Sequence, residues 1–132
     1  MPRATTAPPL AWSRAFPAVP ARVGEARRFL SGILGGHPAA ADAILCLSEL
    51  ATNAIIHSRS GRPGGHYTVR AECGAGRLRV EVRDQGGPWS QAEDTGDDRH
   101  GRGLLIVSQL SAGWGRAGDP AGWTVWFEID CP

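Results

Sequence analysis

The feature of this chain that most constrains its fold is a pair of alternating segments joined by a short glycine turn. Apolar and polar residues alternate over residues 67–73 and again over residues 78–83, which is the period of a half-buried strand. Gly74-Ala75-Gly76 lies between the two segments and predicts an antiparallel hairpin. One face of this hairpin is apolar, so the rest of the chain must cover it. The residues of that face are Tyr67, Val69, Ala71, Cys73, Leu78, Val80 and Val82.

Two amphipathic helices precede the hairpin and can provide the cover. From Val19 to about Leu34, apolar residues recur at helical spacing until Gly35-Gly36 ends the run. Pro38 stands where proline is tolerated at a helix start, and a second helix is predicted from there to about His57. Its continuous apolar stripe predicts a helix packed on the sheet. The stripe consists of Ile44, Leu47, Leu50, Ala51, Ala54 and Ile55.

The remaining segments complete an α+β order. A first strand is predicted over residues 10–16, a third helix from near Arg102, and two strands near residues 113–118 and 122–130. Together the elements run β-α-α-β-β-loop-α-β-β. This order predicts a two-layer α+β sandwich in which three helices cover one face of a mixed, mostly antiparallel sheet.

Size and composition limit the organisation and the partners. A length of 132 residues predicts a single domain, placed at residues 10–132 after a flexible, Pro/Ala/Thr-rich tail at residues 1–9. The formal net charge of +1 gives no electrostatic case for nucleic acid or an acidic membrane. Cys46, Cys73 and Cys131 show no CxxC spacing and are expected to be buried free thiols. Since no membrane-length apolar run or signal-peptide pattern is found, we expect a cytoplasmic protein.

Three polar residues of the second predicted helix share one face. Glu49, Asn53 and His57 stand at i, i+4 and i+8. Such residues most often form the solvated edge of an amphipathic helix. Asn53, however, is a poor helix former inside a helix, and its alanine neighbours leave room for a ligand. His57 lies at the helix end, where a histidine is more often a cap than a catalyst.

Two later segments also carry residues suited to binding. Strand parity places Asp84 on the core side, where a carboxylate needs a hydrogen-bond donor such as an adenine amino group. Alternatively, the strand has already ended and Asp84 caps the turn of Gln85-Gly86-Gly87; both interpretations stay open. Further along, Gly101-Arg102-Gly103-Leu104 leads into the third helix, whose N-terminal N–H groups form a natural phosphate site.

In this order the three motifs resemble those of the GHKL ATPases. The stretch from Glu49 to Asn53 is similar to the N-box of that family, Asp84-Gln85-Gly86 to the first glycine box, and Gly101-Arg102-Gly103-Leu104 to the second. The likeness runs from about residue 10 to the end of the chain. Phe16-Pro17-Ala18 and the segment Glu49–Ala54 resemble the branch of short, stand-alone serine kinases that act as bacterial anti-sigma factors.

The resemblance implies ATP and Mg²⁺ as cofactors and a role for each matched residue. Glu49 would be the base that accepts the proton of the attacking hydroxyl, and Asn53 would coordinate Mg²⁺. Asp84 would bind the adenine amino group. Because the chain has no lysine, Arg99 and Arg102 would supply the positive charge for the γ-phosphate. The implied nucleotide-binding set is Asn53, Asp84, Gly86, Arg99, Gly101, Arg102, Gly103 and Leu104.

One departure from the family pattern lies at the predicted lid, residues 88–100. Pro88 replaces the second glycine of the first box, so a backbone N–H is lost and the hinge is stiffer. The leading interpretation is an anti-sigma factor that is also an ATP-dependent protein-serine/threonine kinase, with a sigma factor and an anti-anti-sigma antagonist protein as partners. The alternative is a nucleotide-gated protein-binding module without kinase activity. Pro88 favours the alternative, whereas the intact Glu49 opposes it.

The polar face of the predicted sheet carries charged and aromatic residues that could meet a partner. Arg77, Arg79 and Arg83 lie there, but Glu81 stands among them, so a solvated face is favoured over a nucleic-acid surface. Homodimers are common among similar kinases. Trp126, which parity places opposite the core face, is a candidate for a contact with a partner.

Overall fold

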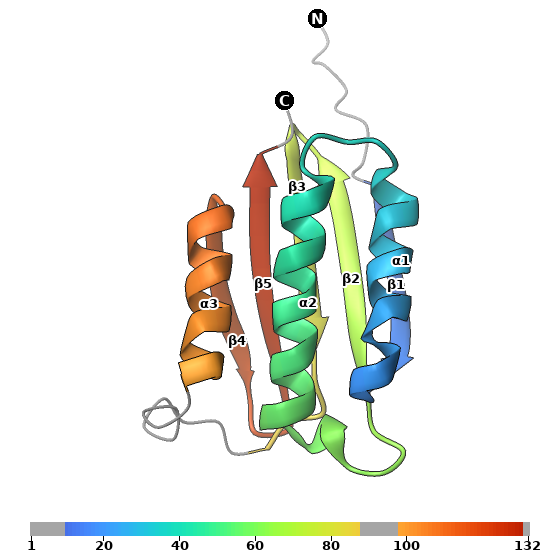
Figure 1. Cartoon of the computed structure of the whole chain (residues 1–132), viewed down its shortest axis with the longest axis vertical. Helices are drawn as coiled ribbons and strands as arrows, with labels where there is room; N and C mark the ends of the chain where they lie inside the picture. Colours follow the sequence, from blue (N-terminus) through green and yellow to red (C-terminus); the bar gives the residue numbers. More distant parts are fainter. Residues whose placement is uncertain (1–9, 88–97, 131–132) are drawn as a thin grey trace, which may run out of the picture.

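The computed structural model of the chain describes residues 10–87 and 98–130, and for residues 98–102 the backbone alone. Within these residues, three α-helices lie side by side on one face of a five-stranded sheet, which confirms the predicted α+β sandwich (Figure 1). In chain order the elements are β1 (Leu10–Pro17), the 3₁₀ turn η1 (Pro20–Arg22), α1 (Val23–Leu34), α2 (Ala40–His57), the 3₁₀ turn η2 (Arg59–Gly61), β2 (His66–Gly74), β3 (Arg77–Arg83), α3 (Asp98–Leu110), β4 (Gly113–Asp119) and β5 (Gly122–Asp130).

The sheet has the strand order β1-β2-β3-β5-β4. The chain passes from β3 through α3 to β4 at the sheet edge, and the β4–β5 hairpin then returns β5 between β4 and β3. β5 is antiparallel to both of its neighbours. Every pair among the described strands is antiparallel, so this part of the chain has none of the parallel pairing that a mixed sheet contains. The register places Val82 between Val69 and Val125.

The core lies between the apolar face of the sheet and the helices. The predicted apolar face of the β2–β3 hairpin is buried, apart from the half-buried Cys73. α2 lies over the middle of the sheet, between α1 and α3 (Figure 1). Small residues on its buried face let α2 come close to the strands. The buried helix residues include Ala26, Leu30, Ala43, Cys46, Leu47, Leu50, Ala51, Ala54 and Val107.

The first two helices begin later than the sequence indicates. The turn η1 precedes α1, so α1 does not begin at Val19. α2 begins at Ala40 rather than at Pro38. In the preceding turn, His37 Nδ1 accepts a hydrogen bond from the Ala39 N–H (2.9 Å), which competes with a first helical turn. None of the described helices is long and apolar enough to span a membrane.

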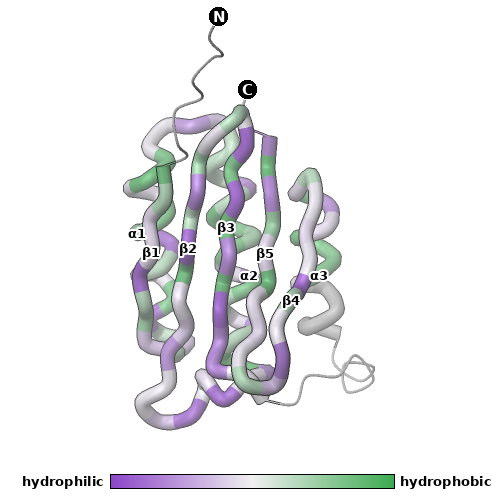
Figure 2. The backbone as a smooth tube through the Cα atoms, turned by 180° about the vertical axis from the view of Figure 1, so that it is seen from behind, coloured by the Kyte–Doolittle hydropathy of each residue, from purple (hydrophilic) through white to green (hydrophobic). Residues whose placement is uncertain are grey.

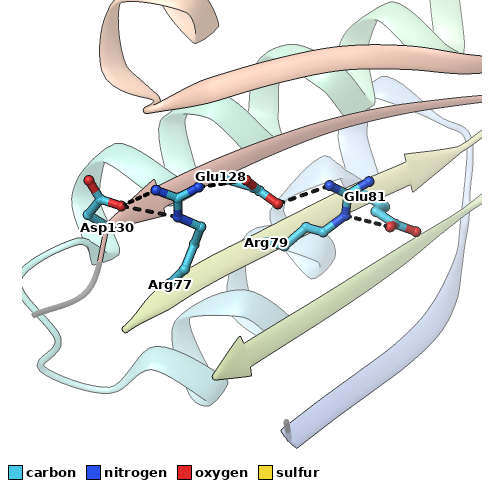
Figure 3. A network of polar contacts seen from close by, with 5 residues as sticks. All are labelled: Arg77, Arg79, Glu81, Glu128 and Asp130. Atoms are coloured by element: carbon cyan, nitrogen blue, oxygen red, sulfur yellow. Dashed lines mark hydrogen bonds and ion pairs between the residues drawn. The ribbon is translucent and has the colours of Figure 1, made fainter. Parts of the chain in front are cut away.

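Figure 2 shows the sheet from the face that none of the described helices covers. Arginines and carboxylates of β3 and β5 form a row of ion pairs on this face (Figure 3). Arg77 pairs with Asp130 (2.8 Å) and with Glu128 (3.1 Å). Arg79 pairs with Glu128 (3.0 Å) and with Glu81 (2.8 Å). Because these arginines already have carboxylate partners, the structure supports the solvated face predicted from the sequence.

Trp126 lies on the same open face and is covered by its neighbours. The guanidinium carbon of Arg79 is 4.3 Å from the centroid of its ring. On the neighbouring strand, a Cβ added to Gly115 would be 2.7 Å from Trp126 Cζ2, so the indole lies directly against that glycine. These contacts leave Trp126 half-buried and reduce the surface it can offer to a partner.

Candidate functional site

The polar face of α2 lies against the first half of α3. Glu49 and Asn53 are half-buried there rather than solvated. A Cβ built on Gly103 would lie 2.9 Å from Glu49 Oε1 and 3.8 Å from Asn53 Oδ1. The lack of a side chain at Gly103 therefore allows the backbone of α3 to approach both residues. Two motifs that are far apart in the sequence are neighbours at this crossing of the helices.

The start of α3 differs from the sequence prediction. α3 begins at Asp98, earlier than the predicted start near Arg102, and both Gly101 and Gly103 are helical. Glycine is a weak helix former, which is why the sequence indicated a turn, but the packing of α3 on α2 outweighs this preference. The unpaired N–H groups of a helix belong to its first turn. Gly103 lies beyond that turn, so its N–H is not one of the unpaired groups. Its lack of a side chain instead lets α3 pack close to α2.

Asp84 follows directly after β3 and is bonded to the start of β5. Its N–H donates to the Trp123 carbonyl (2.9 Å). Its Oδ1 accepts from the N–H of Gly86 (2.7 Å) and from the N–H of Trp123 (3.0 Å). The turn-capping interpretation is thus correct for Oδ1, while Oδ2 has no hydrogen-bond partner among the described residues. Burial raises the pKa of Asp84, although the two N–H groups lower it.

The turn after Asp84 requires glycine. Gly86 has a φ of +83° and Gly87 a φ of +123°, both in the region that side chains rarely adopt. A Cβ on Gly86 would lie 2.2 Å from the carbonyl oxygen of Pro120. From the sequence, Gly86 was expected to let the backbone come close to a nucleotide base. In the structure it lies close to the backbone of the β4–β5 turn. The Gly87 N–H bonds the same Pro120 oxygen (2.8 Å) and fixes the two turns together.

Three of the predicted binding residues line one small cavity. Asn53 of α2, Asp84 after β3 and Leu104 of α3 all contribute to it. Its volume is about 20 Å³, which is room for about one water molecule. The structure therefore brings all three sequence motifs to one place. The other lining residues are Leu50, Ala54, Val82, Arg116, Trp123 and Val125.

Two residues of this cavity, Trp123 and Arg116, are missing from the site predicted from the sequence. Trp123 lies on the core face of β5, and its Nε1 donates to the Gly87 carbonyl (3.0 Å). Arg116 lies on β4 with its guanidinium carbon 4.4 Å from the centroid of the Trp123 ring. The alternation of β5 was sufficient to place Trp123 on the core side. In β4, glycines interrupt the alternation of apolar and polar residues, so the face on which Arg116 lies could not be predicted.

Part of the predicted site lies outside the described residues. This holds for the lid residues 88–97, Pro88 included, and for the side chains of Arg99 and Arg102. The backbone of both arginines belongs to the first turns of α3. Their roles toward the γ-phosphate, and that of Gly101, stay predictions.

The oxygen atoms of Glu49, Asn53 and Asp84 suit a nucleotide that is bound together with a hard cation such as Mg²⁺. Asp84 Oδ2 can accept from an amino group, and the oxygens of Glu49 and Asn53 lie on one helix face. Mg²⁺ is typically bound by one or two protein oxygens together with substrate phosphates. Among residues 10–87 and 103–130, whose side chains the structure describes, no cluster of three or more His, Cys, Asp or Glu could hold a metal alone. A pocket for a small ligand occupies roughly 300–1,000 Å³, so lining side chains must move before a base can enter.

The class of protein follows from a comparison with known families. The family model described as histidine kinase-like ATPase domain matches residues 16–129. The chain therefore belongs to the histidine kinase-like ATPase family, and the resemblance to the GHKL ATPases is confirmed. Membership of this family indicates ATP as the nucleotide.

Two solved structures share the fold. The RsbU and RsbW domains of Rv1364c from Mycobacterium tuberculosis match with a TM-score of 0.72 and 20% sequence identity, over 94% of this chain and 33% of that one. The histidine kinase domain of the blue-light activated histidine kinase EL346 from Erythrobacter litoralis matches with a TM-score of 0.57 and 24% identity, over 88% of this chain and 62% of that one. This chain thus spans less than two thirds of either protein. A comparison with curated proteins finds no match.

Proposed function

We propose that this chain is a cytoplasmic ATP-binding regulatory protein that acts as an anti-sigma factor and as a protein-serine/threonine kinase. The observation that carries the proposal is the meeting of Glu49, Asn53 and Gly103 at one helix crossing, beside the cavity lined by Asp84. The similarity in fold to a structure that contains an RsbW domain supports the same branch of the family.

Glu49 has the surroundings of a general base. Its carboxylate is half-buried at the crossing of α2 and α3, one helical turn from Asn53. In the transfer, the hydroxyl oxygen of the substrate bonds to the γ-phosphorus, the bond from that phosphorus to the ADP oxygen breaks, and the hydroxyl proton passes to Glu49. When bound to Asn53 and the phosphates, Mg²⁺ supplies neutralising charge. Arg99 and Arg102 at the start of α3 would add to it.

The proposal includes two protein partners. The substrate is an anti-anti-sigma antagonist protein, phosphorylated on a serine or threonine. The second partner is a sigma factor. Phosphorylation of the antagonist leaves the kinase free to hold the sigma factor, and the kinase would act as a homodimer.

Transfer of radiolabelled phosphate from ATP to a candidate antagonist tests the kinase assignment. Glu49→Gln keeps the shape of the side chain but removes the base, so the rate of transfer should fall by about 10²- to 10⁴-fold. Thr52→Ala is the matched control, because Thr52 is an exposed residue of the same helix whose hydroxyl donates to the Ser48 carbonyl (2.8 Å). Equal rates in Glu49→Gln and the wild type would contradict the role of Glu49.

The second candidate is a nucleotide-gated protein-binding module without kinase activity. Pro88 at the start of the lid and the small volume of the cavity favour it. It predicts that ATP changes the affinity for a partner while no label is transferred. Partner affinity measured with ATP, with ADP and without nucleotide, alongside the transfer assay, separates the two functions.

A further inference from the structure

The walls of the cavity beside Asp84 differ in their freedom to move. Leu50, Ala54 and Val82 are at most 5% exposed and belong to the packed core, so they form a fixed floor. Arg116 comes from the edge strand β4, is exposed and has a long, flexible side chain. Of these residues, Arg116 is the one with a long, exposed side chain on an edge strand.

Trp123, in contrast, is fixed beside Asp84. Its backbone N–H donates to Asp84 Oδ1 (3.0 Å) and its carbonyl accepts from the Asp84 N–H (2.9 Å). Its indole Nε1 donates to the Gly87 carbonyl (3.0 Å). The ring is thus a rigid aromatic surface next to the carboxylate expected to accept the amino group of a base. A base bonded to Asp84 would lie within reach of this ring, and aromatic rings stack favourably.

In the structure, the guanidinium of Arg116 lies over the Trp123 ring. It is planar and cationic, and its carbon lies 4.4 Å from the centroid of the Trp123 ring. Its positive charge also acts on Asp84, where it lowers the pKa of the carboxyl. Arg116 therefore shares two properties with the expected base: a planar group over the indole and a favourable interaction with the carboxylate.

We propose that Trp123 is the stacking residue for the nucleotide base, and that Arg116 covers Trp123 until the base displaces the guanidinium. This inference rests on the proposed function, because it requires a nucleotide bound at Asp84. It extends the site from α2, α3 and the end of β3 to the two strands β4 and β5. The base can stack on the indole only after the contact between Arg116 and the indole is broken. Arg116 therefore weakens the binding of the base.

The test measures the affinity for adenosine, by its displacement of a fluorescent ATP analogue. Adenosine is uncharged, so the lost charge of Arg116→Ala does not act through phosphates. Since a cation–π contact at an exposed site must no longer be broken, Arg116→Ala should bind adenosine about two- to fivefold more tightly than the wild type. Arg83→Ala is the matched control. Arg83 lies at the same end of the sheet on the opposite face, 3.4 Å from Thr124 Oγ1, and its charge also lowers the pKa of Asp84. Arg83→Ala therefore removes a comparable charge without uncovering the Trp123 ring, and it should not tighten adenosine binding.

A second variant tests the stacking surface itself. Trp123→Leu removes the ring and should weaken adenosine binding by about tenfold or more. Equal or weaker adenosine binding by Arg116→Ala, or an unchanged affinity in Trp123→Leu, would overturn the inference. Asp84→Asn, titrated in parallel with ATP, reports on the nucleotide site alone. ATP binding that Asp84→Asn abolishes, together with unchanged adenosine affinity in Arg116→Ala, would reject the role of Arg116 and leave the proposed function intact. Failure of both ATP and adenosine to bind to the wild type and to Arg116→Ala would reject both.

Discussion

The substitution Gly103→Ala separates the stability of α3 from the chemistry of the site. Within a helix, alanine is favoured over glycine by about 0.5–1 kcal/mol. The added methyl group would lie 2.9 Å from Glu49 Oε1, which is closer than normal contact, but this oxygen is the end of a flexible side chain and can move. The free energy of unfolding should therefore stay equal or rise by up to about 1 kcal/mol, while the carboxylate of Glu49 is pushed away from α3.

Thermal denaturation and the transfer assay measure the two effects. A gain of this size raises Tm by up to roughly 5 °C in a chain of this length. A misplacement of about 1 Å in a catalytic group can cost about 10²-fold in rate, so transfer should fall by that order. Gly32→Ala in α1 is the matched control, because nothing lies within 4 Å of a Cβ at that position. It should give the same gain in Tm with no loss of transfer.

Two results would refute this reasoning. Wild-type transfer by Gly103→Ala would mean that Gly103 and Glu49 do not belong to one catalytic site. Destabilisation by more than about 1 kcal/mol would mean that the contact between α2 and α3 cannot relax, as in an overpacked core.

Three further predictions concern stability and reactivity. Gly86→Ala should lower the free energy of unfolding, measured in urea, by about 2–4 kcal/mol, because its methyl group would lie 2.2 Å from the Pro120 oxygen at a φ of +83°. The control Gly64→Ala has a φ of +79° and nothing within 4 Å of its methyl group, so it should cost only about 1 kcal/mol. Equal losses in the two variants would contradict a clash at Gly86. Burial raises the pKa of Cys46 to about 11, so iodoacetamide at neutral pH should label it only after unfolding, as peptide mass spectrometry can show. Burial raises the pKa of Asp84 above its ordinary value of 3.8, so its contribution to stability is complete below that value and is lost as pH rises through the folded-state pKa. In urea denaturation, the free energy of unfolding of the wild type should fall relative to that of Asp84→Asn as pH rises above 3.8. A rise of the wild type relative to the variant would show that the pKa of Asp84 is not raised.

Local periodicity was sufficient to predict most elements of the fold. The alternation of the β2–β3 hairpin and the apolar stripe of α2 identify faces that must be covered. Both faces are buried in the structure, apart from the half-buried Ile44, Ile55 and Cys73. The strand order was not predictable in the same way. The insertion of β5 between β3 and β4 depends on pairing between distant segments, which no local period records. The antiparallel pairing of β5 with β3 likewise joins segments that are far apart in the sequence.

The candidate site was predictable where a residue belongs to a motif. Asn53, Asp84 and Leu104 were predicted and line one cavity. Gly103 was predicted to cradle the phosphates, whereas its contact with Glu49 depends on how α3 packs on α2, which the motif does not reveal. Arg116 was missed because its contact with the Trp123 ring depends on the β4–β5 register and because glycines obscure the pattern of β4.

The central claim is that the polar face of α2 binds Mg-ATP, and calorimetric titration tests it most directly. The wild type, Asn53→Ala and Thr52→Ala would each be titrated with ATP, with and without Mg²⁺. The account predicts Mg²⁺-dependent binding by the wild type and by Thr52→Ala, and its loss in Asn53→Ala. Mg²⁺-dependent binding of equal strength in Asn53→Ala, or no binding by the wild type at millimolar ATP, would contradict it.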